Sequence, residues 1–438
     1  MKLAIIGGAG VRTPLLVNGL CRSDVPIREI ALYDTDLARL DVVGRLAARV
    51  ASPTVGVTTH SALDPCVADA AFVFISIRVG GIDSRAHDER VSLAHDILGQ
   101  ETVGPAGFAM ALRSIPAVVA YARRIAELAP GAWIVNFTNP VGMVTDALHR
   151  AGCSRAIGIC DTPTELFEDV AHALGRPTAD CTFDYLGLNH LGWLREVYVD
   201  GRPALAPLWS QPERLAALHR APLFAPSFLA DLRLLPTEYL VYYYRPADVR
   251  DNMQRAGRSR GAVVSALSAE LFADLGRVDI DPVTRYETYL AARSAGYMQI
   301  ESGASAPLTP SPWAALTGYD KIALAVVRAI HFNTGALIPL DVPNRGAIRD
   351  LDDDDVVEVP CVVNANGAWP LATGSAPAHV RDLLRRVRAY ERATVEAAMT
   401  GDRASAIAAL ASNPLVSGRD VASALVDALD VPCRAVAP

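Results

Sequence analysis

The stretch that decides the fold is Lys2–Pro14, KLAIIGGAGVRTP, followed by Glu29–Asp34, EIALYD. Each stretch contains a short apolar run with the length of a buried strand. The first run ends in glycines, and Pro14 suits the first turn of a helix. The second run ends in a carboxylate. A strand, a glycine turn, a helix and a strand closed by an acid predict the start of a Rossmann-like, doubly wound α/β sheet.

The same stretch predicts a dinucleotide site. Glycines let the backbone approach a pyrophosphate, whose charge the N-terminus of the next helix stabilises. A carboxylate after the second strand suits the ribose hydroxyls and favours NAD over NADP. The motif alone is weak, because Thr13 replaces its third glycine and such turns also occur for structural reasons. To the cofactor site we assign Gly7, Gly8, Gly10, Val11, Arg12, Asp34 and Asn136.

Two further buried strands are predicted at 133–137 and 155–159, in the motifs WIVNFTNP and GICDTP, and both end abruptly in polar residues. A third segment, GLNHLGW, places polar residues between glycines. The ends of parallel strands face one edge of a sheet, where ligands bind. The polar residues expected to meet there are Asn136, Asn139, Cys160, Asp161, Asn189 and His190.

Cys160 and His190 have two interpretations. They lie 30 residues apart, which is too far for a zinc-finger spacing. At neighbouring strand ends they are able to share one catalytic divalent metal and leave positions open for substrate oxygens. On the residues alone, a buried cysteine beside a hydrogen-bonded core histidine is the commoner explanation. The remaining cysteines are assigned to structural positions: Cys21, Cys66, Cys153, Cys181, Cys361 and Cys433.

Three charged or aromatic segments are candidates for substrate binding. Residues 77–90, IRVGGIDSRAHDER, predict a loop that is either a solvated surface or a lid carrying Arg78 or Arg85. Residues 254–261 are either an anion clamp that includes Arg260 or a solvated basic turn. Residues 235–246 contain four closely spaced tyrosines, most of which are expected in the core.

Composition excludes several classes of protein. The net charge of −7 argues against a nucleic-acid binder, which needs a basic face, so an anionic substrate depends on a local arginine cluster. An odd number of scattered cysteines, seven, is typical of reduced thiols. The chain starts without a basic leader region, and no apolar run approaches the ~18 residues of a membrane span. We expect a soluble cytoplasmic enzyme.

Taken together, the motifs resemble those of glycoside hydrolase family 4, the NAD- and divalent-metal-dependent glycosidases that include 6-phospho-β- and 6-phospho-α-glucosidases. The resemblance covers nearly the whole chain. It implies a lactate/malate dehydrogenase-like fold, with an NAD-binding domain over 1–165 and a C-terminal α+β domain for catalysis, substrate binding and oligomerisation over 166–438. The motifs that carry it are the GGAG turn, IRVGGIDSRAHDER, GQETVGPAGFAMALRSIP, WIVNFTNPVG, GICDTP, GLNHLGW, EYLVYYY and DVVEVPCVV.

The resemblance also implies roles for individual residues. Cys160 and His190 match the ligands of a metal that is usually manganese, and Tyr239, in EYLVYYY, matches the catalytic base. Asn139, Asn189, Arg85 and Arg260 match positions for the substrate and its 6-phosphate. Homodimers or homotetramers are the expected assemblies.

The implied reaction differs from that of ordinary glycosidases, which use two carboxylates. NAD⁺ oxidises the sugar C3 hydroxyl, and the tyrosine removes the acidified C2 proton while the metal acts as a Lewis acid. The leaving group departs from C1, water adds, and NADH reduces C3 again. A tyrosine with an ordinary pKa near ~10 needs a neighbouring cation to act as a base at neutral pH.

Two departures from the family pattern leave alternatives open. Val11 and Arg12 stand where many members carry Ser or Thr, and Asp161 resembles the general acid of α-acting members. A 6-phospho-β-glucosidase is our main hypothesis. The alternatives are a relative acting on α-linked, unphosphorylated or uronide substrates, a net NAD-dependent dehydrogenase, and a catalytically silent NAD-binding sensor.

Overall fold

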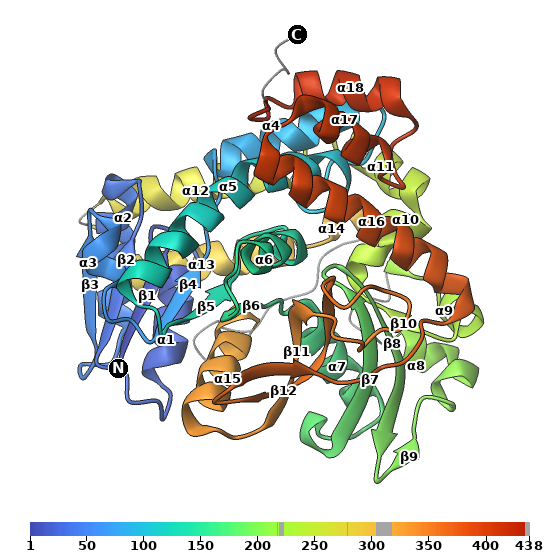
Figure 1. Ribbon diagram of the computed structural model, residues 1–438, viewed down its shortest axis with the longest axis horizontal. Coiled ribbons are helices and arrows are strands. Elements are labelled where there is room, and N and C mark those ends of the chain that lie inside the picture. Colours follow the sequence, from blue (N-terminus) through green and yellow to red (C-terminus); the bar gives the residue numbers. More distant parts are fainter. Residues whose placement is uncertain (217, 219–222, 278, 304–317, 434–438) are drawn as a thin grey trace.

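The computed structural model describes residues 1–216, 218, 223–277, 279–303 and 318–433 (Figure 1). Within these residues a nine-stranded sheet has the order β13-β12-β11-β6-β5-β4-β1-β2-β3. The six strands from β3 to β6 are parallel and follow the dinucleotide-binding order 3-2-1-4-5-6. The strands are β1 Lys2–Ile6, β2 Glu29–Tyr33, β3 Gly56–His60, β4 Phe72–Ile75, β5 Trp133–Asn136, β6 Ala156–Gly158, β11 Ala336–Pro343, β12 Val356–Asn364 and β13 Gly367–Pro370.

The N-terminal lobe confirms the predicted strand–glycine–helix unit. Gly7 has φ +91°, and a Cβ there would lie 2.1 Å from the Ser76 carbonyl oxygen, so the turn requires glycine. Asp34 accepts a hydrogen bond from the Ala9 amide at 3.0 Å, which ties the acidic strand end to the turn. The helices of this lobe are α1 Thr13–Cys21, α2 Leu37–Val50, α3 Leu63–Val67, α4 Gly81–Ala94, α5 Gly104–Leu128, α6 Val141–Arg150 and α7 Thr162–Ala173.

The C-terminal part of the chain contributes strands to the same sheet. β11 pairs antiparallel with β6 through Asp341 and Gly158, and β12 and β13 follow antiparallel. A second sheet contains β7 Cys181–Leu188, β8 Leu191–Val199, β9 Arg202–Pro203 and β10 Leu235–Pro236. The sheet of the predicted 1–165 domain is thus completed by later residues.

Helices from the C-terminal part cover the molecule on two sides (Figure 1). α16 packs on α5, α6 and α17, and together with α18 these helices build one apolar core. α12 and α13 lie beside α4 and α2. The helices are α8 Pro212–Ala216, α9 Pro226–Leu232, α10 Val241–Tyr244, α11 Pro246–Ala256, α12 Arg260–Leu275, α13 Pro282–Ala295, α14 Gln299–Ser302, α15 Tyr319–Phe332, α16 Ala378–Thr400, α17 Arg403–Ala411 and α18 Arg419–Ala428.

One expectation about local structure was wrong. Most of the charged segment 77–90 is the helix α4 and not a loop, because Arg85 pairs with Glu89 one turn later and both side chains are buried. Among the described helices, α5 is long and apolar enough to cross a membrane by length and composition, although Arg113 interrupts its apolar residues. Since 72% of its apolar window is buried in the protein, α5 is a core helix here.

Candidate active site

Cys160 and His190 meet at the carboxyl edge of the parallel strands. Cys160 follows β6, and His190 occupies the turn between β7 and β8 with φ +63°. The Cys160 Sγ lies 3.5 Å from the His190 Nε2, and both side chains are buried. Burial lowers the pKa of His190 to about 3, whereas burial and the carboxylates of Glu358 and Asp161 raise that of Cys160. Without a cation the pair is a neutral imidazole and a thiol.

Tyr239 lies directly against this pair. Its ring stacks on the His190 imidazole, with the centroids 3.6 Å apart and the planes at 3°. Its hydroxyl is 3.2 Å from the Tyr297 hydroxyl, which donates to Glu238 at 3.0 Å. Burial, then Glu101 and Glu238, raise the pKa of Tyr239 well above its usual value. Arg85 is a neighbouring cation that interacts with Tyr239, but burial and the carboxylates outweigh it, so the described protein groups do not lower this pKa overall.

Arg85 projects from α4 and is held by two carboxylates. Its guanidinium contacts Glu89 at 2.8 Å and Glu101 at 2.7 Å, and Arg78 contacts Glu101 at 2.6 Å. Burial raises the pKa of Glu101, but the guanidiniums of Arg85 and Arg78 outweigh this effect and keep it ionised. Arg85 is thus a fixed, buried cation.

Arg260 and Arg293 enlarge this positive charge. Arg260 begins α12 and donates to the backbone oxygen of Arg293 on α13, while Arg293 donates to the Tyr289 hydroxyl at 2.9 Å. In the described part of the chain, neither guanidinium has a carboxylate within ion-pair distance. Burial and the neighbouring guanidiniums, including Arg85 for both, lower the pKa of Arg260 and Arg293. Nothing in the sequence around Arg293 marked it as part of a site.

Asn189 is oriented by a buried carboxylate that the sequence analysis did not identify. Its amide nitrogen donates to Glu358 at 3.1 Å, and the Tyr185 hydroxyl donates to the other oxygen of Glu358 at 2.6 Å. Burial raises the pKa of Glu358 to about 7. Asp341, opposite Glu358 in the strand register, has no partner among the described residues for either carboxylate oxygen. The motif DVVEVPCVV was the only signal for Glu358.

The two asparagines of WIVNFTNP lie in different surroundings. Asn136 is buried, and its amide bonds the Thr138 backbone and the Thr145 hydroxyl. Its assignment to the cofactor stays a prediction. Asn139 precedes a cis proline, and its amide oxygen is buried without a partner among the described residues. An orphaned acceptor at a strand end is available to a ligand.

Two family models cover most of the chain. Residues 2–176 match the model described as "Family 4 glycosyl hydrolase", and residues 185–416 match "Family 4 glycosyl hydrolase C-terminal domain". The protein belongs to glycosyl hydrolase family 4. The predicted family is therefore confirmed, and the two models divide the chain between residues 176 and 185.

Relatives in the family carry both anomeric names. The "Probable 6-phospho-beta-glucosidase" of Bacillus subtilis is 32% identical over 98% of this chain and 95% of its own length. A phospho-alpha-glucosidase of Clostridium acetobutylicum is 30% identical, with 97% and 96% covered. Family membership therefore does not distinguish β- from α-linked substrates.

Solved structures confirm the predicted fold. The 6-phospho-beta glucosidase of Thermotoga maritima, solved with manganese, NAD⁺ and glucose-6-phosphate, has a TM-score of 0.83 at 28% identity and covers 98% of this chain and 97% of its own. A lactate dehydrogenase from a deep-sea metagenome shares the fold alone, with a TM-score of 0.54 at 13% identity over 91% of this chain and 98% of its own.

The family 4 chain departs from the pattern at Arg12 and Asp161, and these two residues face each other. Arg12 Nη1 lies 3.9 Å from Asp161 Oδ2, and Asp161 directly follows Cys160. The Tyr286 hydroxyl on α13 donates to the Val11 carbonyl, which joins the C-terminal helices to the glycine turn. The predicted cofactor turn and the predicted metal pair are therefore linked through side chains.

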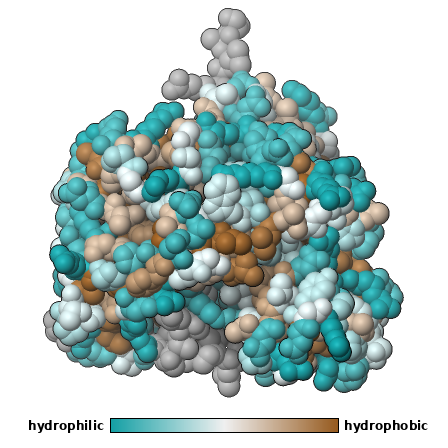
Figure 2. All heavy atoms as spheres, turned by 60° about the horizontal axis from the view of Figure 1, so that its bottom comes forward, coloured by the Kyte–Doolittle hydropathy of each residue, from teal (hydrophilic) through white to brown (hydrophobic). Residues whose placement is uncertain are grey.

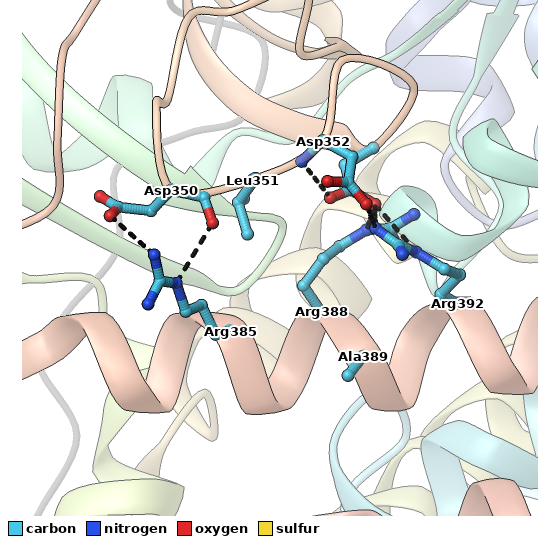
Figure 3. Close-up of a pocket in the computed structure, with 8 residues that line it drawn as sticks. Asp350, Leu351, Asp352, Arg385, Arg388, Ala389 and Arg392 are labelled. Atoms are coloured by element: carbon cyan, nitrogen blue, oxygen red, sulfur yellow. Dashed lines mark hydrogen bonds and ion pairs between the residues drawn. The ribbon is translucent and has the colours of Figure 1, made fainter.

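A pocket at α16 lies apart from the family 4 site (Figure 3). Arg385 reaches Asp350, and Arg392 reaches Asp352 and Asp355, so the charges that line it are already paired. We assign this pocket no ligand.

Proposed function

We propose that this protein hydrolyses 6-phospho-β-glucosides with NAD and a divalent metal, manganese being the first choice. One observation carries the proposal. The buried pair Cys160 and His190 and the ring of Tyr239 meet within contact distance, in a region that also contains Arg260 and Arg293, which have no carboxylate within ion-pair distance among the described residues. Base, metal donors and anion-binding groups are the parts that the family reaction requires.

The donor atoms fit a divalent metal. A thiol and an imidazole nitrogen 3.5 Å apart are able to bind one ion once the thiol loses its proton. In the ranges that the structure describes, there is no group of three or more His, Cys, Asp or Glu side chains suited to a metal. A site with two such protein ligands keeps positions open for substrate oxygens, which a Lewis acid needs.

The glycine turn fits NAD. Gly7, Gly8 and Gly10 bring bare backbone to the N-terminus of α1, where a pyrophosphate is stabilised. Asp34, at the end of β2, is half-buried beside this turn and carries the charge that bonds ribose hydroxyls. Arg12 adds a cation at the same place.

When bound, NAD would exchange a hydride with the sugar and the metal would stabilise negative charge on sugar oxygens. The residues of the chain then have separate tasks. Tyr239 accepts the C2 proton, and Tyr297 and Glu238 hold its hydroxyl in place. Arg85, Arg260 and Arg293 orient the 6-phosphate. Because Tyr239 is buried, water is kept from the reacting carbon.

The β anomer is proposed over the α anomer because the GICDTP and GLNHLGW motifs match the β-acting branch better. One observation favours the alternative. Asp161 is a carboxylate 4.0 Å from the Cys160 sulfur, where α-acting members place a general acid. An α-acting 6-phosphoglucosidase is therefore the second candidate.

The test is release of p-nitrophenol from the β and α anomers of p-nitrophenyl glucoside 6-phosphate, beside the unphosphorylated pair. The assay contains NAD⁺, Mn²⁺ and a thiol reductant, and absorbance of NADH is followed in parallel. Cleavage of the phosphorylated β anomer without net NADH is the expected result. Cleavage of the α anomer alone would make Asp161 the general acid, and stoichiometric NADH would mean a net dehydrogenase.

Location and assembly stay predictions. Seven free cysteines fit a reducing compartment, and we propose a cytoplasmic enzyme that binds neither nucleic acid nor membranes. Apolar side chains gather in the middle of one face among hydrophilic ones (Figure 2). Exposed apolar residues occur on or beside β11 and β13, namely Leu337, Trp369 and Leu371. A homodimer or homotetramer is proposed, and light scattering of the purified protein tests it.

A further inference from the structure

The segment Gln100–Thr102, within the motif GQETVGPAG, touches the site at two points and has no role in the proposal so far. Glu101 holds Arg85 and Arg78. The Thr102 hydroxyl oxygen lies 2.8 Å from the Nδ1 atom of His190, on the opposite side of the ring from the Cys160 contact. Thr102 therefore contacts Nδ1, the ring nitrogen of His190 that does not face Cys160.

The directions of the hydrogen bonds follow from the neighbours of Thr102. The Gln100 amide oxygen accepts from two backbone amides, Thr102 at 2.6 Å and Val103 at 2.8 Å. Backbone N–H groups only donate, so the oxygen of Gln100, and not its NH₂ group, occupies this position. The same oxygen lies 2.8 Å from the Thr102 hydroxyl oxygen.

Two oxygens at 2.8 Å need a proton between them, and a carbonyl oxygen has none to give. The Thr102 hydroxyl proton is therefore directed at Gln100. Its oxygen then has only lone pairs left for His190, so the Nδ1 atom must carry the proton in that contact. A neutral imidazole protonated at Nδ1 has its free lone pair on Nε2, the atom that faces the Cys160 sulfur.

The surroundings leave this arrangement little freedom. Gln100, Thr102 and His190 are each less than a tenth exposed. A Cβ at Gly107 would lie 2.3 Å from the Thr102 carbonyl carbon, so α5 packs against the backbone of this segment. The stacked Tyr239 ring also restricts rotation of the His190 imidazole.

We propose that Gln100 and Thr102 are positioning residues that hold His190 in its Nδ1–H tautomer and thereby present Nε2 to the metal. Metal-binding histidines commonly have their second nitrogen fixed by an outer partner. Here the partner is the Thr102 hydroxyl, which donates its own proton to the Gln100 amide oxygen. The consequence for metal binding rests on the proposed function, whereas the tautomer of the metal-free protein does not.

The first measurement is the tautomer. Metal-free protein labelled with ¹⁵N-histidine is examined by two-bond ¹H–¹⁵N correlation, and the His190 signals are assigned by their loss in His190→Gln. We expect a protonated Nδ1 and an unprotonated Nε2 in the wild type. Thr102→Val has a side chain that cannot accept a hydrogen bond, so it should shift His190 toward the Nε2–H form. Gln100→Leu should give a mixture of the two tautomers. An Nε2–H histidine in the wild type would overturn the proposal.

The second measurement is Mn²⁺ affinity by calorimetry and by electron paramagnetic resonance of the free ion. Thr102→Val should weaken binding roughly 10- to 100-fold, the usual effect of losing an outer-shell partner, and Thr102→Ser should restore most of it. Thr394→Val is the matched control, because Thr394 is buried and its hydroxyl donates to the Tyr390 carbonyl within α16, in a cluster separate from the Cys160 and His190 pair.

The outcomes separate the two proposals. Equal Mn²⁺ affinity of Thr102→Val and Thr394→Val would refute a positioning role for Thr102. If the wild type binds no Mn²⁺, the proposed metal site fails, and the spectrum still decides the tautomer. NAD affinity of every variant should match the wild type, which controls for loss of folding.

Discussion

Arg85 and Arg388 are both buried arginines, and they belong to ionic clusters that differ in their balance of charge. Arg388 of α16 is 1% exposed and contacts three carboxylates, those of Asp146, Asp355 and Glu391. These partners come from α6, from the turn before β12 and from α16 itself. The cluster joins three elements, and Arg150 and Arg392 also pair with Asp146 and Asp355, so its carboxylates and guanidiniums are matched.

Around Arg85 the guanidiniums exceed the carboxylates that pair with them. Arg85 contacts Glu89 and Glu101, and its guanidinium is close enough to lower the pKa of both Arg260 and Arg293. Cations that lack carboxylate partners are retained at a cost to stability unless a ligand supplies the negative charge. Both arginines are buried, so it is the balance of charge that distinguishes the Arg388 cluster from the proposed anion-binding site.

The largest expected effect concerns the catalytic side of this comparison. Tyr239→Phe should lower kcat by about 10³- to 10⁴-fold, because a general base contributes this order of rate. Exchange of the C2 proton with deuterated solvent, followed by NMR of the sugar, should disappear. Thermal stability should change little, since the ring still stacks on His190. Undiminished exchange would rule out Tyr239 as the base.

The next effect concerns stability and the Arg388 cluster. Arg388→Met should cost about 3–5 kcal/mol of unfolding free energy, because it removes the buried guanidinium that three carboxylates share. Urea unfolding measures it. Arg386→Met on the same helix is the control, since Arg386 is 57% exposed and should change stability by less than ~0.5 kcal/mol. Equal unfolding free energies of the two variants would show that Arg388 does not stabilise the fold.

Removing an arginine from the proposed phosphate site should lower activity and leave stability nearly unchanged, the reverse of the result expected for Arg388→Met. Arg260→Ala should lower kcat/KM for the phosphorylated substrate roughly 10- to 100-fold, the worth of one charged hydrogen bond, and leave unfolding free energy nearly unchanged. Activity on an unphosphorylated glucoside should not fall in proportion. Arg255→Ala, in the exposed end of α11, is the matched control. A uniform loss on both substrates would argue against phosphate recognition by Arg260.

The smallest effect is the pH dependence of the unfolding free energy that Glu391 gives to the Arg388 cluster. Burial raises the pKa of Glu391 from 4.5 to about 7, more than the Arg388 guanidinium lowers it. Its contribution to stability is present below about pH 4.5 and is lost as pH rises through 7. From pH 5 to 8 the wild type should lose on the order of 1 kcal/mol relative to Glu391→Gln, which cannot ionise.

Urea unfolding at several pH values measures this difference. Glu396→Gln on the same helix is the control, because Glu396 is exposed. A wild type that gains stability relative to Glu391→Gln over this range would reverse the sign and show that the carboxylate is ionised throughout.

Local patterns predicted much of the fold. Amphipathic repeats over 379–399, 404–410 and 418–429 predict three helices, and α16, α17 and α18 match these ranges within two residues. The charged segment 77–90 was misread as a loop because dense charge usually marks solvent. In α4 the charges pair with one another and with Glu101, and only tertiary contacts provide that partner.

The site was predicted in part. Cys160, His190 and Tyr239 were chosen from their motifs, and the structure brings them together. Their roles remain predictions. Arg293 carried no local signal, because an arginine on an amphipathic helix is common anywhere, and Thr102 lay within the motif GQETVGPAG without being singled out from it.

The sequence by itself determined the parallel sheet, the glycine turn with Asp34, and the strand-end positions of Cys160 and Asn139, because strand, turn and helix preferences act over a few residues. Only the tertiary structure decided which charges remain without partners among the described residues and which group is the donor in each hydrogen bond. Those depend on contacts such as Thr102 with His190 and Arg260 with Arg293, between residues far apart in the chain. Burial then fixes their consequences, since the cost of an unpaired charge rises as water is excluded.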